Sequence, residues 1–308
     1  MTTLLYTHPS SLEHDAGPGH PESPARIRAI LAALEQAELD GVERREPSRA
    51  TREQLERVHG GGFIDRILGG VPSSGYLRID ADTVMSPGSG EAALRAAGAA
   101  CAAVDAVIGG EAANAFCALR PPGHHAEPTR AMGFCLFNNV AVGARQALAV
   151  HEIARVSIFD FDVHHGNGTQ AAFERERRVQ YLSTHQWPLY PGTGARSETG
   201  VGNIVNRPLP AGTGSSEWRK VVEADILTAI DRFAPGLIMV SAGFDAHRRD
   251  PLAMLELTED DYGWVTRELV TLAQRHARGR LVSVLEGGYD LTALANSSLA
   301  HLNALRAA

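Results

Sequence analysis

Residues whose side chains could bind a metal or transfer a proton occur in short clusters along this chain. One such cluster is the run from Asp160 to His164. Side chains two residues apart share one face of a strand, so Asp160, Asp162 and His164 are expected to line up. Two buried carboxylates repel each other unless a cation or a hydrogen-bond donor compensates them. A metal ion beside Asp162 and His164 supplies that cation. The alternative is a strand end whose charges point into solvent.

A metal site of this kind needs a third ligand. Catalytic zinc is usually held by three protein ligands and keeps one open position. Asp245 follows another predicted strand, after the close turn that Gly243 allows, and is the expected third ligand. His247 is a competing ligand, and the alternative for His247 is a histidine at the surface or rim of the site. Two aspartates and one histidine form a harder ligand set than three histidines, so iron or manganese is an alternative to zinc.

A histidine pair, His124 and His125, follows the rigid turn Pro121–Gly123. Neutral imidazole is suited to taking a proton from a water molecule and returning it to a leaving amine. Such histidines need partners that orient their rings. Asp160 and Asn167 are available for this purpose, because neither is needed as a metal ligand.

Two further clusters leave alternatives open. Tyr289 follows the glycine pair 287–288 after a predicted strand, where its phenol could donate a hydrogen bond to a developing oxyanion. The alternative is a structural tyrosine at a strand–helix corner. Gly133, Phe134 and Tyr190 predict either an apolar tunnel or ordinary packing.

Alternating strand and helix patterns must position these clusters. The predicted strands are Leu4–Thr7, Asn114–Leu119, Val156–Asp160, Val179–Ser183, Leu237–Ser241 and Leu281–Leu285. The predicted helices are Pro24–Ala37, Gly90–Ile108, Asn138–His151, Ser216–Phe233, Glu259–Ala277 and Leu291–Leu305. This alternation predicts an α/β fold, in which a mostly parallel sheet carries helices on both faces. Such sheets place ligands beyond the carboxyl ends of their strands, which is where the clusters fall.

Composition narrows the classes of function. The chain has 308 residues, 44% of them hydrophobic, and a formal net charge of −7, which argues against non-specific binding of nucleic acid. Its three cysteines form no CxxC pair, so we expect buried, reduced thiols. The N-terminus lacks a signal-peptide pattern, and Arg95 and Asp105 interrupt the longest run of small residues. We therefore expect a cytoplasmic protein without a membrane or nucleic-acid partner, and its oligomeric state stays open.

At these clusters the chain resembles the histone deacetylase superfamily of the arginase–deacetylase fold, and most of all its class II branch and bacterial relatives. The matching stretches are GHPESPARI (19–27), RPPGHHA (120–126), GFCLFNNVAV (133–142), DFDVHHGNGTQ (160–170), YPGTG (190–194), SAGFDAHRRDPL (241–252) and EGGYD (286–290). They span nearly the whole chain. The resemblance implies one three-layer domain, residues 1–308, with about eight strands.

The resemblance also implies roles for the residues of the site. One zinc ion per chain, or ferrous iron in the cell, would be held by Asp162, His164 and Asp245. The implied catalytic residues are His125 as general base and acid, His124 as its electrostatic partner, Asp160 and Asn167 as their orienting partners, and Tyr289 as the group that polarises the scissile carbonyl. Many relatives have aspartate where this chain has Asn167. Because an amide carries no negative charge, His125 should be less basic here.

Further residues are implied around the substrate. The acyl-lysine channel would be lined by Gly133, Phe134, Tyr190 and Leu252, with Tyr190 standing where phenylalanine is usual. Arg26 would lie on an internal cavity near the exit for acetate. A structural potassium or sodium ion would lie near Asp160, Asp162, His164, Ser183 and Thr184, largely on backbone carbonyls.

The resemblance leaves two substrate classes, which are acetyl-lysine side chains of proteins and small acetylated amines such as acetylpolyamines. A eukaryotic polyamine-specific relative carries glutamate at the position of Leu252, and bacterial ones have a long insertion that the short segment 63–91 lacks. These differences favour acetyl-lysine. A ureohydrolase of the same fold would need two manganese ions, and a non-catalytic acyl-lysine binding module would be expected to lack Tyr289 or a histidine.

Overall fold

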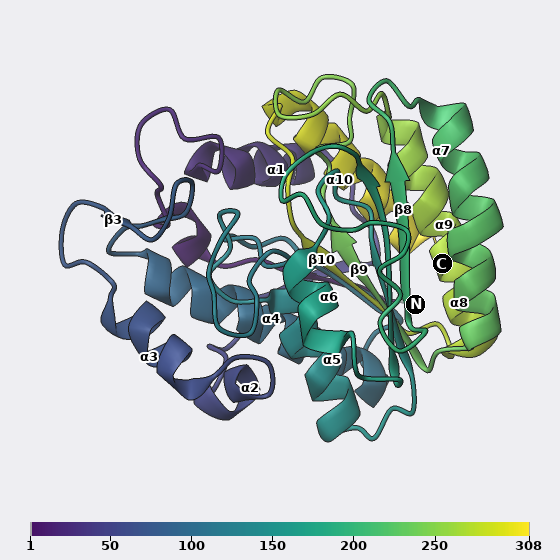
Figure 1. Ribbon diagram of the computed structural model, residues 1–308, viewed down its shortest axis with the longest axis horizontal. Coiled ribbons are helices and arrows are strands. Elements are labelled where there is room, and N and C mark those ends of the chain that lie inside the picture. Colours follow the sequence, from purple (N-terminus) through teal and green to yellow (C-terminus); the bar gives the residue numbers. More distant parts are fainter. Residues whose placement is uncertain (1, 308) are drawn as a thin grey trace.

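A single eight-stranded sheet forms the centre of the molecule in the computed structural model, which describes residues 2–307 (Figure 1). The strand order is β2-β1-β5-β10-β9-β6-β7-β8, and every neighbouring pair is parallel. The strands are β1 (Thr3–Tyr6), β2 (Val42–Arg45), β5 (Asn114–Cys117), β6 (Val156–Asp160), β7 (Val179–Gln186), β8 (Ile204–Leu209), β9 (Leu237–Ala242) and β10 (Leu281–Leu285). A separate small hairpin joins β3 (Leu77–Arg78) to β4 (Val84–Met85). The predicted parallel sheet is confirmed.

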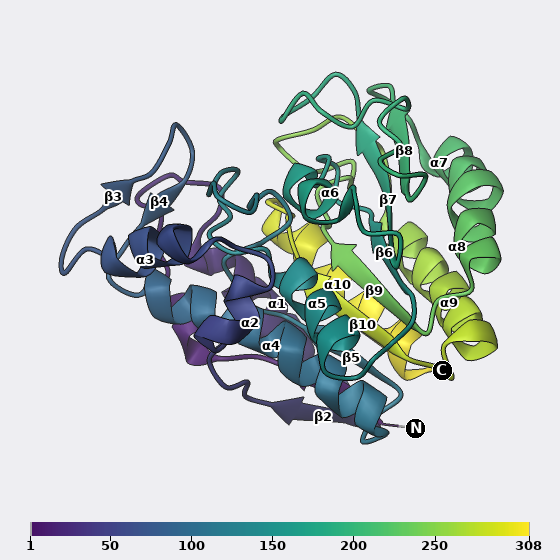
Figure 2. The same ribbon diagram turned by 60° about the horizontal axis from the view of Figure 1, so that its bottom comes forward.

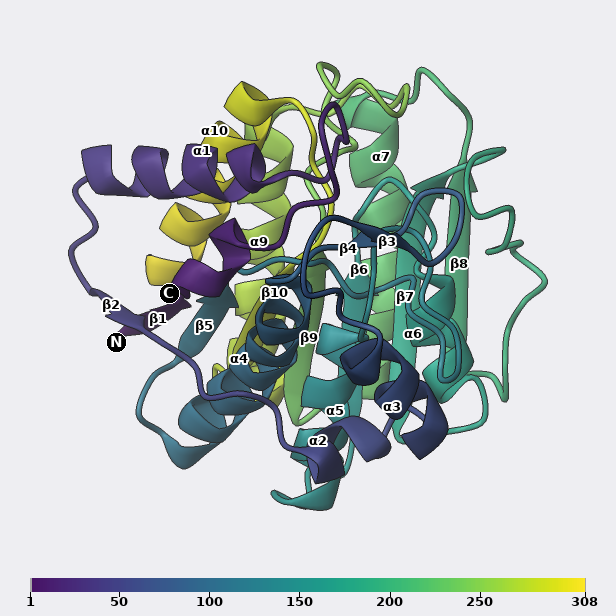
Figure 3. The same ribbon diagram turned by 90° about the vertical axis from the view of Figure 1, so that its left-hand side faces the viewer.

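Helices cover both faces of this sheet (Figure 2). One face carries α4 (Ser89–Gly109), α5 (Asn139–Ala149) and α6 (Asn167–Phe173). The other carries α1 (Pro24–Gln36), α7 (Ser215–Val221), α8 (Thr228–Phe233), α9 (Glu259–His276) and α10 (Leu291–Arg306). A π-helical segment, Val222–Leu227, joins α7 to α8. The short helices α2 (Arg52–Glu56) and α3 (Gly61–Gly69) pack outside α4 and α5 (Figure 3).

Successive residues of the central strands face opposite helix layers. In β6, Val156 and Ile158 belong to the core under α4 and α5, whereas Phe159 belongs to the core under α9 and α10. Every residue of β5, β6, β7, β9 and β10 is buried. Strands buried on both faces appear in a sequence as continuous apolar runs, and this is why these strands were predictable.

Sequence reasoning missed the short hairpin strands β3 and β4 and the two edge strands of the large sheet, β2 and β8. Strand β2 has the sequence VERR and is largely exposed, so it has no apolar pattern. Strand β8 contains Pro208, and proline in a short run argues against a central strand. Both form because a neighbouring strand offers backbone hydrogen bonds, which the local sequence does not reveal.

Helix α4 corrects one expectation. By length and composition alone it could cross a bilayer, with a mean hydropathy of 1.5, so Arg95 and Asp105 do not rule this out. In the fold, 67% of that window is buried, and α4 packs against α5 and β5. Its many alanines make α4 apolar, and their small side chains allow it to pack closely against neighbouring elements in the core.

The cysteines behave as predicted. Cys101, Cys117 and Cys135 are all buried free thiols. Burial raises the pKa of Cys101 to about 12 and that of Cys135 well above its usual range. Since the thiolate is the reactive form, these side chains are inert packing groups at neutral pH.

Candidate metal centre and active site

Five loops meet at the carboxyl ends of the strands, because the strands that precede these loops are neighbours in the sheet (Figure 1). They follow the carboxyl ends of β5, β10, β9, β6 and β7. The loops hold nearly all the clusters predicted from the sequence, in segments 120–125, 286–289, 243–252, 161–167 and 187–190. The prediction that strand ends would gather these clusters is confirmed.

Asp162, His164 and Asp245 form a buried group whose ligand atoms all lie within 4.8 Å of one another. His164 Nδ1 lies 3.0 Å from Asp162 Oδ1 and 3.1 Å from Asp245 Oδ2. Zinc–ligand bonds of about 2.0–2.2 Å in tetrahedral geometry separate ligand atoms by roughly 3.3–3.6 Å. The three side chains therefore fit a divalent metal ion of this kind.

The electrostatics of Asp162, His164 and Asp245 favour a positive charge among them. Burial lowers the pKa of His164, but hydrogen bonds to Asp162 and Asp245 outweigh burial and raise that pKa to about 10. Burial and the charge of Asp162 raise the pKa of Asp245. Two like charges that are buried together need a cation between them, and this position offers a histidine nitrogen and two carboxylate oxygens to that cation.

Backbone amides aim the ligand side chains. His164 N–H donates to Asp162 Oδ1 at 2.9 Å, and Gly287 N–H donates to Asp162 Oδ2 at 2.8 Å. Val163 N–H donates to Asp245 Oδ1 at 2.8 Å. Strand β6 ends at Asp160, so strand periodicity is not the reason that these side chains converge. The side chains converge because the loop after β6 turns its N–H groups toward the carboxylates of Asp162 and Asp245.

Two glycines make room for the ligands. A Cβ atom added to Gly243 would overlap Asp162 Oδ2, and one added to Gly287 would overlap Asp245 Oδ2. The backbones after β9 and β10 therefore approach the candidate metal ligands Asp162 and Asp245 more closely than any other residue type permits.

The paired histidines have different partners. His124 Nδ1 lies 3.0 Å from Asp160 Oδ2, and His125 Nδ1 lies 2.8 Å from Asn167 Oδ1. Both oxygens accept only, so each Nδ1 carries a proton. In the neutral tautomer Nε2 of His125 is then free to accept a proton. The predicted orienting pairs are present in the structure.

Their environments push the two pKa values apart. Burial would lower the pKa of His124, but the charges of Asp162 and Asp160 raise it well above its usual range. Burial and the charge of His124 lower the pKa of His125 well below its usual range. Neighbouring groups with separated pKa values can take different roles, and His125 is the member of this pair that favours the neutral form.

Sequence reasoning missed two groups behind the histidines. Tyr181 OH donates to Asp160 Oδ2 at 3.0 Å, and Gly166 N–H donates to Tyr181 OH at 2.9 Å. The carboxylate of Glu286 accepts from the N–H groups of Gly123 at 2.6 Å and His124 at 3.0 Å. The signal for Glu286 was an acidic residue directly after the buried strand β10, and the signal for Tyr181 was a phenol within the fully buried strand β7.

A pocket of about 220 Å³ opens onto His125 and His164. All four predicted channel residues line it, as do Tyr289, Leu189 and Asp82. The ring of Tyr190 meets that of His125 edge-on, with centroids 5.1 Å apart. Burial raises the pKa of Tyr289 well above its usual range, so its phenol stays a hydrogen-bond donor. Gly133, Phe134, Tyr190 and Leu252 therefore share one pocket with Tyr289, and their roles stay predictions.

Several predicted residues lie outside this pocket. Arg26 is fully buried, and its guanidinium donates to the carbonyls of Gly288 and Glu286 while stacking 4.9 Å from the ring centre of Tyr289. Ser183 is the strand partner of Asp160, and the Thr184 hydroxyl accepts from Trp218 Nε1. A potassium or sodium ion at these backbones remains a prediction.

His247 differs from its expected place. It is buried, 2% exposed, and does not lie on the surface or rim. Its Nδ1 accepts from Arg249 N–H at 3.1 Å, and its Nε2 faces Glu259 at 3.3 Å. Both ring nitrogens are thereby directed to residues outside the metal group, because the chain turns at His247.

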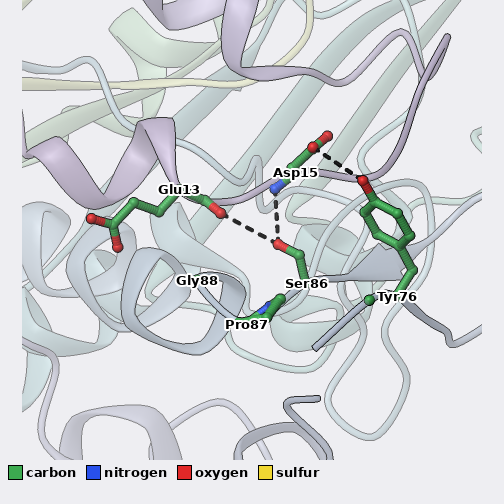
Figure 4. Close-up of a pocket in the computed structure, with 7 residues that line it drawn as sticks. Glu13, Asp15, Tyr76, Ser86, Pro87 and Gly88 are labelled. Carbon is green, nitrogen blue, oxygen red and sulfur yellow. Dashed lines mark hydrogen bonds between the residues drawn. The ribbon is translucent and has the colours of Figure 1, made fainter. Parts of the chain in front are cut away.

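A larger hollow, of about 560 Å³, lies elsewhere on the molecule (Figure 4). Asp15 accepts from Tyr76 OH at 3.3 Å there, and Ser86 links Asp15 N–H to the carbonyl of Glu13. These polar groups satisfy one another, and the hollow contains neither histidine nor cysteine. Its size does not make it the chemical site.

Comparisons with known proteins find one family that is similar to this chain over nearly its whole length. A model of the histone deacetylase domain matches residues 20–305. A probable deacetylase of Archaeoglobus fulgidus is 40% identical over 298 residues, which cover 94% of this chain and 82% of the relative. A histone deacetylase-like amidohydrolase of Pseudomonas aeruginosa is 41% identical over 281 residues, covering 89% of this chain and 74% of the relative. The crystal structure of the HDA15 HD domain has a TM-score of 0.95 and 35% identity, over 99% of this chain and 88% of that one.

Proposed function

Because this chain belongs to the histone deacetylase family, we propose that it is a zinc-dependent deacetylase that hydrolyses the N-acetyl amide of acetyl-lysine side chains and releases acetate. The observation that carries this proposal is one pocket that is lined by a histidine, His125, and a phenol, Tyr289, and that reaches the buried group of Asp162, His164 and Asp245 through His164. Asp162, His164 and Asp245 would hold the metal. A bound divalent zinc ion supplies Lewis acidity, which favours deprotonation of water and polarises a carbonyl.

In this proposal His125 moves the proton. Its free Nε2 accepts a proton from the attacking water and later gives it to the leaving amine nitrogen. His124, held in its charged form by Asp160 and Asp162, keeps the neighbouring His125 imidazole neutral at rest. Asn167 fixes the tautomer of His125 through its 2.8 Å hydrogen bond.

Tyr289 and Gly133 would bind the reacting amide. The Tyr289 hydroxyl donates to the carbonyl oxygen as negative charge develops on it. The carbonyl of Gly133 accepts the N–H of the substrate amide. Phe134, Tyr190 and Leu252 form apolar walls that suit the methylene chain of a lysine.

The rim of the pocket supports a protein substrate. Tyr190 and Leu252 line the pocket, and each is 37% exposed. Two further exposed apolar side chains lie on the same two loops, Trp187 at 37% exposure and Met254 at 62%, and Met254 N–H joins these loops by donating to the side chain of Gln186. An apolar rim matches side chains that flank an acetyl-lysine better than the polar chain of a polyamine. The carboxylate of Asp82 at the same pocket favours the second candidate, a small acetylated amine with a distal ammonium group.

An assay with both substrate classes tests the proposal. We expect purified enzyme to act on acetyl-lysine peptides with a kcat/KM that exceeds its value for acetylated polyamines by about tenfold or more, since apolar pockets discriminate to about this extent. Leu252→Glu, which adds a carboxylate to the mouth of the pocket, should lower the ratio of kcat/KM for acetyl-lysine peptides to kcat/KM for acetylated polyamines. The reverse preference in the unmodified enzyme would establish the second candidate, and activity on neither class would refute the deacetylase proposal.

Replacement of Tyr289 by phenylalanine is expected to lower kcat by about 100- to 1,000-fold, which is typical for loss of an oxyanion donor. Zinc content, measured by elemental analysis, should not change, because the ring of Tyr289 is not a ligand. Tyr76→Phe, which removes an exposed phenol that bonds only to Asp15, is the matched control. Full activity of the Tyr289→Phe enzyme would remove this phenol from the mechanism.

Three further assignments complete the proposal. A potassium or sodium ion would bind backbone carbonyls around Asp160, Asp162, His164, Ser183 and Thr184. Arg26, beneath Tyr289, would guide acetate from the site. We also place the enzyme in the cytoplasm. Ferrous iron is the alternative metal, and activity restored to stripped enzyme under anaerobic conditions by iron as well as zinc would test it.

A further inference from the structure

The carboxylate of Asp250 joins two walls of the active-site pocket that come from distant parts of the chain. Its Oδ1 accepts from Leu252 N–H at 2.9 Å, which is a local turn. Its Oδ2 accepts from Tyr289 N–H at 2.8 Å, across 39 residues of sequence. Leu252 and Tyr289 both line the pocket, but Asp250 itself does not.

This bond is the one side-chain link that the described structure gives to the backbone of Tyr289. Tyr289 follows two glycines, 287 and 288, whose backbones have few steric restraints. Other bonds hold residues 286–288, because Arg26 donates to the carbonyls of Glu286 and Gly288 and Gly287 N–H donates to Asp162 Oδ2. Tyr289, which lines the pocket, is held at its own backbone N–H by Asp250, from the segment that follows β9.

The carboxylate has few other reasons to be buried. Asp250 is 8% exposed, and among residues 2–307 no cationic side chain forms an ion pair with it. Burial and the charge of Asp245 raise the pKa of Asp250 to about 7. A buried acid held only by backbone N–H groups is costly for stability, which makes a purely structural origin a poor explanation.

We infer that Asp250 is a positioning residue, which ties Leu252 and Tyr289 together and so sets where the phenol stands relative to the metal ligands. The inference rests on the proposed deacetylase function for its catalytic consequence. The physical link between the two loops does not depend on that function.

Asp250→Asn is the informative substitution. Asparagine keeps the shape of the side chain and the local turn to Leu252 N–H, because Asx turns accept either residue. It presents an NH₂ group to Tyr289 N–H, so two donors face each other and the link is lost. Asp250→Ser, which is too short to reach Tyr289 but keeps a local turn, is the second variant should the first fold poorly.

A double-mutant cycle tests whether Asp250 acts through Tyr289. We expect Asp250→Asn to lower kcat on an acetyl-lysine peptide by about 10- to 100-fold, with a smaller change in KM. In a Tyr289→Phe background the same change should cost less than about threefold, because the hydroxyl that it displaces is already absent. An equal loss in both backgrounds, or no loss in the first, would overturn the inference.

Hydrogen–deuterium exchange gives a readout that does not need catalysis. Deuterium uptake should rise in peptides that contain residues 286–291 in Asp250→Asn and Asp250→Ser, and stay unchanged in Arg249→Ala. Arg249 is the matched control, since it forms a half-exposed ion pair with Asp290 at 3.4 Å on the same two loops. Unchanged uptake in both Asp250 variants would refute the link. Increased uptake in an enzyme that deacetylates no substrate would instead refute the proposed function and leave the link standing.

Discussion

Asp245→Asn is expected to abolish tight zinc binding and to lower deacetylase turnover on the order of 1,000-fold or more. The substitution keeps the shape of the side chain and its 2.8 Å bond from Val163 N–H, but it replaces the oxygen that faces His164 by an NH₂ group. A neutral donor cannot serve as an anionic ligand. Loss of a Lewis acid costs several kcal/mol of transition-state stabilisation, which corresponds to at least this factor. Elemental analysis after dialysis and initial rates at added zinc measure the two effects.

Stability without metal separates this effect from misfolding. Burial and the charge of Asp162 raise the pKa of Asp245 although His164 opposes this, so the charged form of Asp245 is disfavoured in the folded protein when no metal is bound. Stripped Asp245→Asn enzyme should therefore melt no lower than stripped unmodified enzyme. Added zinc should raise the melting temperature of the unmodified enzyme only, because ligand binding to the folded state stabilises it. A large drop in melting temperature of the stripped variant would contradict this account.

Replacement of His125 by alanine is expected to lower kcat by about 1,000-fold while zinc stays bound. General acid–base catalysis contributes about 100- to 10,000-fold, and His125 would serve both proton transfers. His125 touches no ligand atom directly, and its Nδ1 bonds to Asn167 at 2.8 Å. Zinc content and kcat on an acetyl-lysine peptide are the measurements. Retained activity above about one tenth would show that another group is the base.

The partner of His125 gives the same prediction a pH test. Burial and the charge of His124 lower the pKa of His125, and the neutral amide of Asn167 does little to restore it. Asn167→Asp adds a negative charge 2.8 Å from the ring, which should raise this pKa. Because a base must be unprotonated to act, the acidic limb of kcat/KM should move to higher pH.

Glu127 makes a matched control necessary. Asn167 donates its amide to Glu127 Oε1 at 2.8 Å, so a carboxylate at position 167 would face another carboxylate. Asn167→Asp combined with Glu127→Gln removes this repulsion and should show the shift clearly. An acidic limb that does not move in the double variant would exclude His125 as the group that titrates.

The sequence was sufficient for the outline of the fold and for most of the side chains that meet at the candidate site. Central strands such as β6 and β10 were predicted with their observed bounds, because strands buried on both faces have continuous apolar runs. The rule that parallel sheets place ligands at their carboxyl ends then located Asp162, His164 and Asp245 together. Resemblance to a known family supplied the roles of His124, His125 and Tyr289, which spacing alone left open.

The tertiary structure decided the arrangement around these side chains. The partners of His124 and His125 lie 36 and 42 residues away, and Glu286 reaches Gly123 across 163 residues. Asp250 reaches Tyr289 across 39 residues in the same way. Local pattern reports which face of a strand is buried, since that depends on residues two apart. The local pattern does not predict which buried acceptor bonds to which donor. Such pairs form only when distant loops pack together at the carboxyl ends of the strands. The sequence therefore indicated which residues belong to the candidate site, and the tertiary structure decided which hydrogen bonds orient their side chains.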